Sequence, residues 1–319
     1  MRAVIYDSYG GPEVLRLTDI DVPEPAKGQI RVKVLACAVN LSDWEHLTGS
    51  PLWVRTVAGL FRPKKPVLGS DIVGLIDKLG EGVSGFDIGQ RVMGDYVFSL
   101  GGFAEYVCVP AKETVAVPDA LSDEVAACLP QAGGIAVAGT EGLSQGDRLL
   151  INGAGGGSGT MALQLAKTAG AHVTAVDNSK KFEWLITLGA DDVIDYSKVD
   201  FTETGAKWDR ILDMVATRGP RELSRALAEG GTYKALGGGV PSLLSIVIGG
   251  KLLSRNRSIG MLLVPSGEAL TNRVAELAVE GRITPHLEAV LPLSSVPEAL
   301  DRTGRGDVLG KLVIKPGLE

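Results

Sequence analysis

The segment from Ile151 to Lys167, INGAGGGSGTMALQLAK, most constrains the fold because it joins a short apolar strand, a glycine-rich turn and an amphipathic helix. Ala154, Gly156 and Gly159 occupy the three small-residue positions of a G-x-G-x-x-G fingerprint, with alanine in the first. In that motif the first residue permits a tight turn, the second lets the backbone approach a pyrophosphate, and the third lets helix pack on strand. Because a helix N-terminus offers unpaired N–H groups to an anion, the predicted phosphate-binding residues are Ala154, Gly156, Gly157, Ser158 and Gly159.

A flexible loop would have the same glycine content, so the residues that follow decide between the two interpretations. Leu149 to Asn152 predicts a buried strand before the turn, and apolar residues from Met161 to Ala166 predict a helix that Gly170 closes. His172 to Val176 (HVTAV) then has the composition of a second strand. Strand, helix and strand together have the size of a parallel crossover unit, which favours a dinucleotide-phosphate site.

Length and composition limit the classes of protein to which the chain can belong. Its 319 residues exceed the usual size of one domain, so we expect two. The formal net charge of -6 argues against a nucleic-acid partner bound through its phosphates. We see no leader before the first predicted strand and no apolar run near the ~20 residues of a bilayer span, so we expect a cytoplasmic protein without a membrane partner. The three cysteines, an odd number, favour free thiols over disulfides.

The pattern of predicted secondary structure changes along the chain. Residues 1–120 contain short alternating runs between turn residues, which predicts a small β-barrel or sandwich. In residues 121–264 strands and helices alternate after a helix that Ser122 is expected to cap, which indicates an α/β domain. Its later predicted strands are 192–196, 210–215 and 232–236. Residues 265–319 end in a predicted strand, Lys311 to Ile314, and we expect this tail to complete the first domain.

Motifs along nearly the whole chain resemble one known family. They are the opening MRAVIYDSYGGPEVL, ACAVNLSDWEHLTG, VLGSDIVGLIDKLGEGVSGFDIGQRVMG, GGFAEYVCVP, the glycine fingerprint, LGADDVIDY and the closing GKLVIKP. With them the chain resembles zinc-independent members of the medium-chain dehydrogenase/reductase superfamily, close to the quinone oxidoreductase-like and NAD(P)-dependent alcohol dehydrogenase-like group. The resemblance implies a GroES-like β-barrel domain, an inserted Rossmann domain with a doubly wound parallel sheet, and an active site in the cleft between them.

The resemblance also bears on zinc. In zinc-bearing relatives a cysteine stands where this chain has Asn40, and a His-Glu pair stands where it has Ser70 and Asp71. A catalytic zinc needs three protein ligands from Cys, His or carboxylate, so we expect no metal here. An improvised site from Cys37, His46 and Asp71 has too few of the usual ligands to be preferred.

The choice of nicotinamide cofactor depends on the end of the second predicted Rossmann strand, where Asp177 stands. An acid at this place accepts a hydrogen bond from the adenosine ribose and repels a 2′-phosphate, which favours NADH. In similar NADPH-dependent quinone reductases, the residues aligned with Lys181 and Tyr196 hold the 2′-phosphate. Asp177 is equally a candidate helix cap and Lys181 a candidate solvated lysine. We therefore expect NAD(P)H as the cofactor, with NADH preferred.

Further site residues follow from the resemblance, each with a structural alternative. It places Asn40 near the nicotinamide ribose and substrate and makes Asp43 the acid of an N-x-x-D element, although both also suit a hydrogen-bonded turn. Tyr96 is a candidate donor to the substrate oxygen, and a core tyrosine is the alternative. Near the cofactor the resemblance places Val215, Gly237, Gly238 and Lys311. A hydroxyl that often holds the nicotinamide in relatives is missing at Ile135-Ala136.

Without a metal to polarise a carbonyl, hydride addition to a quinone or an α,β-unsaturated carbonyl is favoured, since the developing charge is delocalised. Two alternatives stay open: a zinc-free alcohol or ketone oxidoreductase, and a dinucleotide-binding protein without turnover. The expected partner is a small electrophilic substrate. Pro51 to Pro66 either lines its entrance or forms a solvated segment anchored by Trp53. The resemblance implies a homodimer, to which the apolar run Ser242 to Leu253 is suited.

Overall fold

The computed structural model describes residues 1–253 and 256–318. The chain forms two compact units, the first from residues 1–134 with the chain from Pro265 onward, and the second from residues 135–264. Helix α3 (Asp123–Ala127) packs on strands of the first unit, which explains why the first boundary lies beyond residue 120. Ser122 caps α3 as predicted, since its hydroxyl accepts the N–H of Val125 at 3.3 Å.

The second unit has one parallel sheet of six strands with the spatial order β10-β9-β8-β11-β12-β13. The strands are β8 (Arg148–Asn152), β9 (His172–Asp177), β10 (Asp192–Asp195), β11 (Trp208–Asp213), β12 (Leu227–Ala235) and β13 (Ser258–Met261). The chain reverses direction across the sheet between β8 and β11, which is the order of a Rossmann domain. The predicted doubly wound parallel sheet is confirmed.

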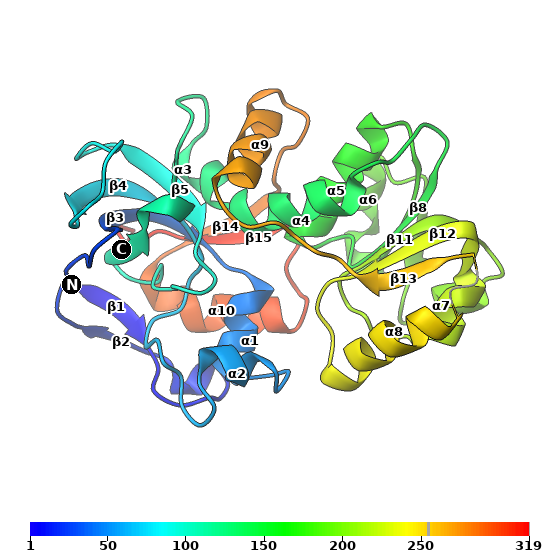
Figure 1. Cartoon of the computed structure of the whole chain (residues 1–319), viewed down its shortest axis with the longest axis horizontal. Coiled ribbons are helices and arrows are strands. Elements are labelled where there is room, and N and C mark those ends of the chain that lie inside the picture. The colour runs from blue at the N-terminus through cyan, green and yellow to red at the C-terminus, as the bar shows by residue number, and fades with distance from the viewer. Residues whose placement is uncertain (254–255, 319) are drawn as a thin grey trace. The chain divides into compact units, whose positions relative to one another are not determined.

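Helices cover both faces of this sheet. On one side lie α5 (Gly157–Thr168) and α6 (Phe182–Thr187), and on the other α7 (Pro220–Ala226) and α8 (Val240–Leu253) (Figure 1). The strand β8 is buried on both faces, with Leu149, Leu150 and Ile151 fully inaccessible. Such two-sided burial explains why the strand is a continuous apolar run rather than an alternating one.

The first unit is built on a largely antiparallel sheet with the path β14-β15-β3-β4-β5-β7, and β6 pairs with β3 beside that path. Its strands are β3 (Gln29–Ala38), β4 (Asp71–Leu79), β5 (Arg91–Asp95), β6 (Tyr106–Pro110), β7 (Val115–Ala116), β14 (Leu287–Leu291) and β15 (Lys311–Ile314). A separate hairpin joins β1 (Arg2–Ile5) and β2 (Arg16–Asp19). The last strand, β15, pairs antiparallel with the end of β3, so the chain's final segment returns to the first sheet.

The helices of the first unit are α1 (Leu41–Thr48), α2 (Val54–Ala58), α3, α9 (Glu268–Val279) and α10 (Val296–Gly304) (Figure 1). Helix α4 (Pro130–Thr140) begins in the first unit and ends in the second. Within residues 1–253 and 256–318, no helix combines the length and the hydropathy needed to cross a bilayer.

Candidate functional site

The glycine-rich loop follows β8 and leads into α5, as the fingerprint predicted. The tight turn, however, falls on Gly153, whose φ of +87° lies in the left-handed region that favours glycine. Ala154, to which we had assigned the turn, is fully buried. The correction has a simple cause, since an alanine in a left-handed turn would bring its Cβ against the backbone.

Gly156 and Gly159 have different surroundings. A Cβ added to Gly159 would lie 2.5 Å from the carbonyl oxygen of Gly153 and 2.6 Å from that of Ala154, so only glycine lets α5 approach the loop. A Cβ on Gly156 would meet only the Gly153 oxygen, at 3.6 Å. Helix α5 begins at Gly157, so the first N–H groups of its N-terminus have no carbonyl partner within the helix. The loop therefore fits the phosphates of a dinucleotide.

Asp177 ends β9 and folds back on the glycine-rich loop. Its carboxylate accepts the backbone N–H of Gly155 at 2.7 Å and that of Asn178 at 2.8 Å. The ammonium of Lys181 lies 3.3 Å away, and both charged side chains are buried. The cap of the next helical turn is Asn178 rather than Asp177, and Lys181 is not a solvated lysine. The acid and the cation that argued for different cofactors thus form one buried ion pair.

The other predicted residues of the second unit follow strands of the sheet. Tyr196 comes after β10 and is 54% exposed, and Val215 comes after β11 and is 44% exposed. Gly237 and Gly238 follow β12 with φ values of +82° and +100°. All four positions lie just beyond carboxyl ends of parallel strands, where ligands of such sheets bind.

Asp213 was not predicted, although it organises the same edge of the sheet. It is fully buried, and its carboxylate accepts hydrogen bonds from the Asn152 amide, the Tyr233 hydroxyl and the N–H groups of Val215 and Ala216, all within 2.9 Å. These bonds fix the loop that carries Val215 to strands β8, β11 and β12. An acid at the very end of an apolar strand was the available signal.

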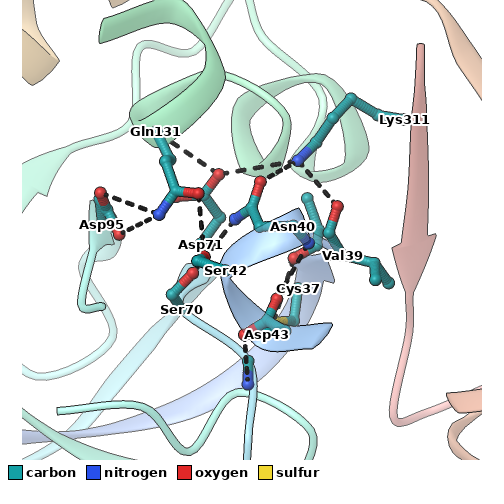
Figure 2. Close-up of polar contacts among 12 residues, drawn as sticks. Cys37, Val39, Asn40, Ser42, Asp43, Ser70, Asp71, Asp95, Gln131 and Lys311 are labelled. Carbon is teal, nitrogen blue, oxygen red and sulfur yellow. Dashed lines mark hydrogen bonds and ion pairs between the residues drawn. The ribbon is translucent and has the colours of Figure 1, made fainter. Parts of the chain in front are cut away.

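In the first unit, Asn40 and Lys311 are in contact although they lie at opposite ends of the chain (Figure 2). The Lys311 ammonium donates to the Asn40 side-chain oxygen and, at 3.0 Å, to the carbonyl of Val39. The Asn40 amide nitrogen donates to the Ser70 hydroxyl at 3.1 Å. Because an ammonium can only donate, Lys311 dictates which way the Asn40 amide points.

Two carboxyl groups and a glutamine extend this network (Figure 2). Asp71 is fully buried, 3.9 Å from the Lys311 ammonium, and accepts the backbone N–H of Gln131 at 3.1 Å. The Gln131 side-chain amide donates to Asp95 at 3.3 Å, and its oxygen accepts the Ser42 hydroxyl at 3.0 Å. Burial raises the pKa of both carboxyls, that of Asp95 to about 6. Sequence reasoning missed Gln131, Asp95 and Ser42 because each side chain comes from a different element.

Asp43 supports the backbone of Asn40 through hydrogen bonds. It is fully buried in α1, and its carboxylate accepts the N–H of Asn40 at 2.9 Å and that of Gly69 at 3.0 Å. The first bond forms a capping box with Asn40 as the N-cap. Burial raises the pKa of Asp43 to about 7. The N-x-x-D element thus sets the backbone from which Asn40 projects.

The structure places Tyr96 in the core, which favours the structural alternative over its assignment as a donor to the substrate. Its side chain is 1% exposed, and its hydroxyl is hydrogen-bonded to that of Thr114 at 2.8 Å. Burial raises the pKa of this phenol well above its usual value. A tyrosine follows β5 here because its ring fills the core and its hydroxyl finds a buried partner.

Comparison with known proteins identifies the family of the chain. The family model described as "Alcohol dehydrogenase GroES-like domain" matches residues 26–119, and the family model described as "Zinc-binding dehydrogenase" matches residues 188–314. A chloroplastic quinone oxidoreductase of Triphysaria versicolor is 31% identical over 99% of this chain and 98% of its own. The chain belongs to the medium-chain dehydrogenase/reductase superfamily.

Two further relatives in this superfamily bear on substrate and cofactor. The 2-methylene-furan-3-one reductase of Solanum lycopersicum is 30% identical over 99% of this chain and 79% of its own. A mycobacterial protein solved in complex with NADPH is 26% identical, with a TM-score of 0.82 over 99% of this chain and 100% of its own. The chain is therefore an oxidoreductase of an NAD(P)-dependent family.

Zinc-bearing members of the superfamily hold a catalytic metal, and the residues here do not match its ligands. In the part of the chain that the structure describes, no three His, Cys, Asp or Glu side chains are placed to hold a metal ion. At the corresponding positions stand the Asn40 amide, the Ser70 hydroxyl and the Asp71 carboxylate, with the Lys311 ammonium beside them. Zinc takes anionic or imidazole ligands, and a buried cation next to them would oppose its binding.

The segment from Pro51 to Pro66 is largely exposed. It contains the short helix α2, and Trp53 is 41% and Phe61 86% exposed, so Trp53 does not anchor it in the core. Val57 and Lys64 line a cavity of about 60 Å³ together with Phe98. The structural alternative of a core-anchored segment is therefore wrong.

Proposed function

We propose that this protein is a metal-free reductase that transfers hydride from NAD(P)H to a quinone or an α,β-unsaturated carbonyl. The observation that carries the proposal is that Asn40, Ser70 and Asp71 stand where zinc-bearing relatives have a cysteine and a His-Glu pair, with the Lys311 ammonium bound to Asn40 and ion-paired with Asp71. The names of two relatives, a quinone oxidoreductase and a 2-methylene-furan-3-one reductase, support the same class of acceptor.

The network favours an acceptor that is already activated. The Lys311 ammonium donates to Val39 and Asn40 and lies 3.9 Å from the Asp71 carboxylate, and the Asn40 amide donates to Ser70. A network satisfied within the protein supplies fixed dipoles but no open electrophilic position for a carbonyl oxygen. Quinones and enones need less help, since the charge that develops on hydride addition is delocalised.

The chain's own residues then have separable tasks. The reduced nicotinamide supplies the hydride when it is bound. The loop from Gly153 to Gly159 holds the phosphates, and Asp213 fixes the loop of Val215. Asp43 and Lys311 fix the backbone and the amide of Asn40, and water or a nearby hydroxyl supplies the proton.

Steady-state oxidation of NADH and NADPH with a quinone, an enone and a simple ketone tests this proposal. We expect turnover with the first two, unchanged after exhaustive treatment with a chelator, and turnover at least about 100-fold slower with the ketone. Activity only on the ketone would favour the alcohol or ketone oxidoreductase. Tight NAD(P)H binding without oxidation across the acceptors would favour a binding protein.

We propose NADH as the preferred cofactor because an acid at the end of the second Rossmann strand suits the adenosine 2′-hydroxyl better than a 2′-phosphate. Lys181 is ion-paired with Asp177, so each charge compensates the other, and the preference rests on the carboxylate as a hydrogen-bond acceptor for the ribose. The Asp177→Ser variant is expected to shift the NADH to NADPH preference at least about tenfold towards NADPH, since it removes that carboxylate. An unchanged preference would show that the Asp177 argument is wrong.

We also propose a homodimer formed through the edge of the Rossmann sheet. Strand β13 is an edge strand, and α8 beside it exposes Leu244, Val247 and Ile248 by 56%, 43% and 54%. The side chains of residues 251–255 lie outside the description. Sedimentation velocity is expected to give twice the chain mass, and a monomer at all concentrations would contradict this proposal.

A further inference from the structure

Asp71 and Asp95 face each other directly across the antiparallel strands β4 and β5. Directly opposite residues on such strands project to the same side of the sheet. Gln131, at the start of α4, joins them, since its backbone N–H binds Asp71 and its side-chain amide binds Asp95 (Figure 2). Gln131 thus links the two carboxyl groups of Asp71 and Asp95, which we call the acid pair.

The acid pair has one nearby cation, the Lys311 ammonium, in the part of the chain that the structure describes. Other titratable groups facing the pair are acids or neutral at pH 7: Asp43, Cys37, Tyr96, Glu113 and Cys128. Asp71 is fully buried and Asp95 half-buried on directly opposite residues, so two carboxylates would repel each other here and one of them keeps its proton. Burial raises the pKa of Asp71 well above its usual range, and Asp95 raises it further.

We propose that Asp71 and Asp95 share one proton in the resting protein, and that this proton keeps Lys311 in place on Asn40. With one proton the pair carries a single negative charge, which the Lys311 ammonium balances. When the proton is lost, the second carboxylate draws the ammonium away from the Val39 carbonyl and the Asn40 oxygen. Asp71, Asp95 and Gln131 are therefore positioning residues, and their effect on turnover rests on the proposed function.

The Asp95→Asn variant removes one acid of the pair while it keeps a side chain of nearly the same size and shape. Asparagine keeps an oxygen for the Gln131 amide but removes the second acid, so Asp71 is expected to ionise against Lys311. Difference infrared spectroscopy at pH 7 is expected to show the loss of one protonated carboxyl band. Asp87→Asn, at an exposed acid of the same unit, is the matched control and should leave that band unchanged. Asp71→Asn should remove the same band if Asp95→Asn does not fold.

Stability and turnover give two further readouts. The acids of the pair bind protons more tightly in the folded protein than in the unfolded chain, so their contribution to stability is present at low pH. It is lost as the pH rises through about 6 and above. The wild type should therefore lose stability over this range, and Asp95→Asn should lose less. With a quinone as acceptor, the alkaline fall in kcat should move up by at least about 1 pH unit in Asp95→Asn.

An unchanged carboxyl band together with an unchanged pH profile of stability in Asp95→Asn would overturn the proposal. These two measurements need no acceptor, so they remain decisive if the protein oxidises NAD(P)H with none. A lost band with an unmoved pH profile of kcat would retain the shared proton and overturn its effect on Asn40. Asp87→Asn should match the wild type in all three readouts.

Discussion

The Asp177–Lys181 ion pair of the second unit and the acid pair of the first unit hold their charges in different ways. In the second unit, Asp177 and Lys181 form an ion pair of one acid and one cation at 3.3 Å. In the first unit, Asp71 lies 3.9 Å from the Lys311 ammonium, and Asp95 stands directly opposite Asp71 on the neighbouring strand. Burial raises the pKa of Asp95 to about 6 and holds the pKa of Asp71 well above its usual range. We therefore expect the acid pair of the first unit to respond to pH near neutrality.

The candidate site residues of the two units also differ in kind, since one set acts through the backbone and the other through side chains. The predicted phosphate site is formed by the small residues of the loop from Gly153 to Gly159 and by the backbone N–H groups at the start of α5. Side chains from α1, β4, β5, α4 and β15 form the network around Asn40. A site built from backbone groups tolerates substitutions of side chains as long as its small residues are kept. In a buried side-chain network, by contrast, each substitution leaves a neighbouring polar group without its hydrogen-bond partner.

The largest effect is expected from Lys311→Met, which leaves the buried acids of the first unit without their cation. The free energy of unfolding at pH 7 should fall by about 3 kcal/mol, as measured by urea denaturation. Lys315→Met is the matched control on the same part of the chain, because Lys315 pairs with Glu124 at a partly exposed position. It should cost less than about 1 kcal/mol. Equal costs would contradict the dependence of the first unit on one cation.

An intermediate effect is expected from alanine in the phosphate loop. Gly159→Ala places a Cβ against two backbone oxygens and should lower the free energy of unfolding by about 2 kcal/mol. Gly156→Ala meets nothing closer than 3.6 Å and should leave stability unchanged while weakening NAD(P)H binding about tenfold or more. Thermal denaturation and fluorescence titration measure the two quantities. If both variants lose stability equally, the loop is not divided into a packing position and a binding position.

The smallest effect is expected from Tyr96→Phe. Its hydroxyl bonds Thr114 in the core of the first unit, so the variant should lose about 1 kcal/mol of stability. The kcat and KM for the electrophilic acceptor should match those of the wild type. A fall in kcat at unchanged stability would restore Tyr96 as a donor to the substrate.

The contrast between the units explains how much the sequence could predict. The Rossmann half was predictable because its fingerprint lies within seven consecutive residues and its strands are apolar runs. Even there, the turn was assigned to Ala154 instead of Gly153, since the pattern marks small residues without giving their φ angles. The pairing of Asp177 with Lys181 was also missed, because each was considered only for its effect on the cofactor.

The network of the first unit could not be predicted in the same way. Asn40 and Lys311 were found through family motifs, but their contact joins two ends of the chain. Gln131 and Asp95 carry no local pattern, and only the register of β4 on β5 and the start of α4 bring them together. The burial of the Tyr96 hydroxyl could not be predicted, because sequence position does not reveal it.

Strand β15 gives the first unit a particular order of assembly. Residues 135–264 leave the ribosome as one continuous stretch, so the second unit can begin to fold while synthesis continues. The first unit must wait for Lys311, which arrives with β15 at its pairing site beside Ala38. Until then Asp71 lacks the Lys311 ammonium, and the end of β3 pairs with β4 on one edge only. The newly made chain therefore completes its charge balance and its last strand pairing in a single late step.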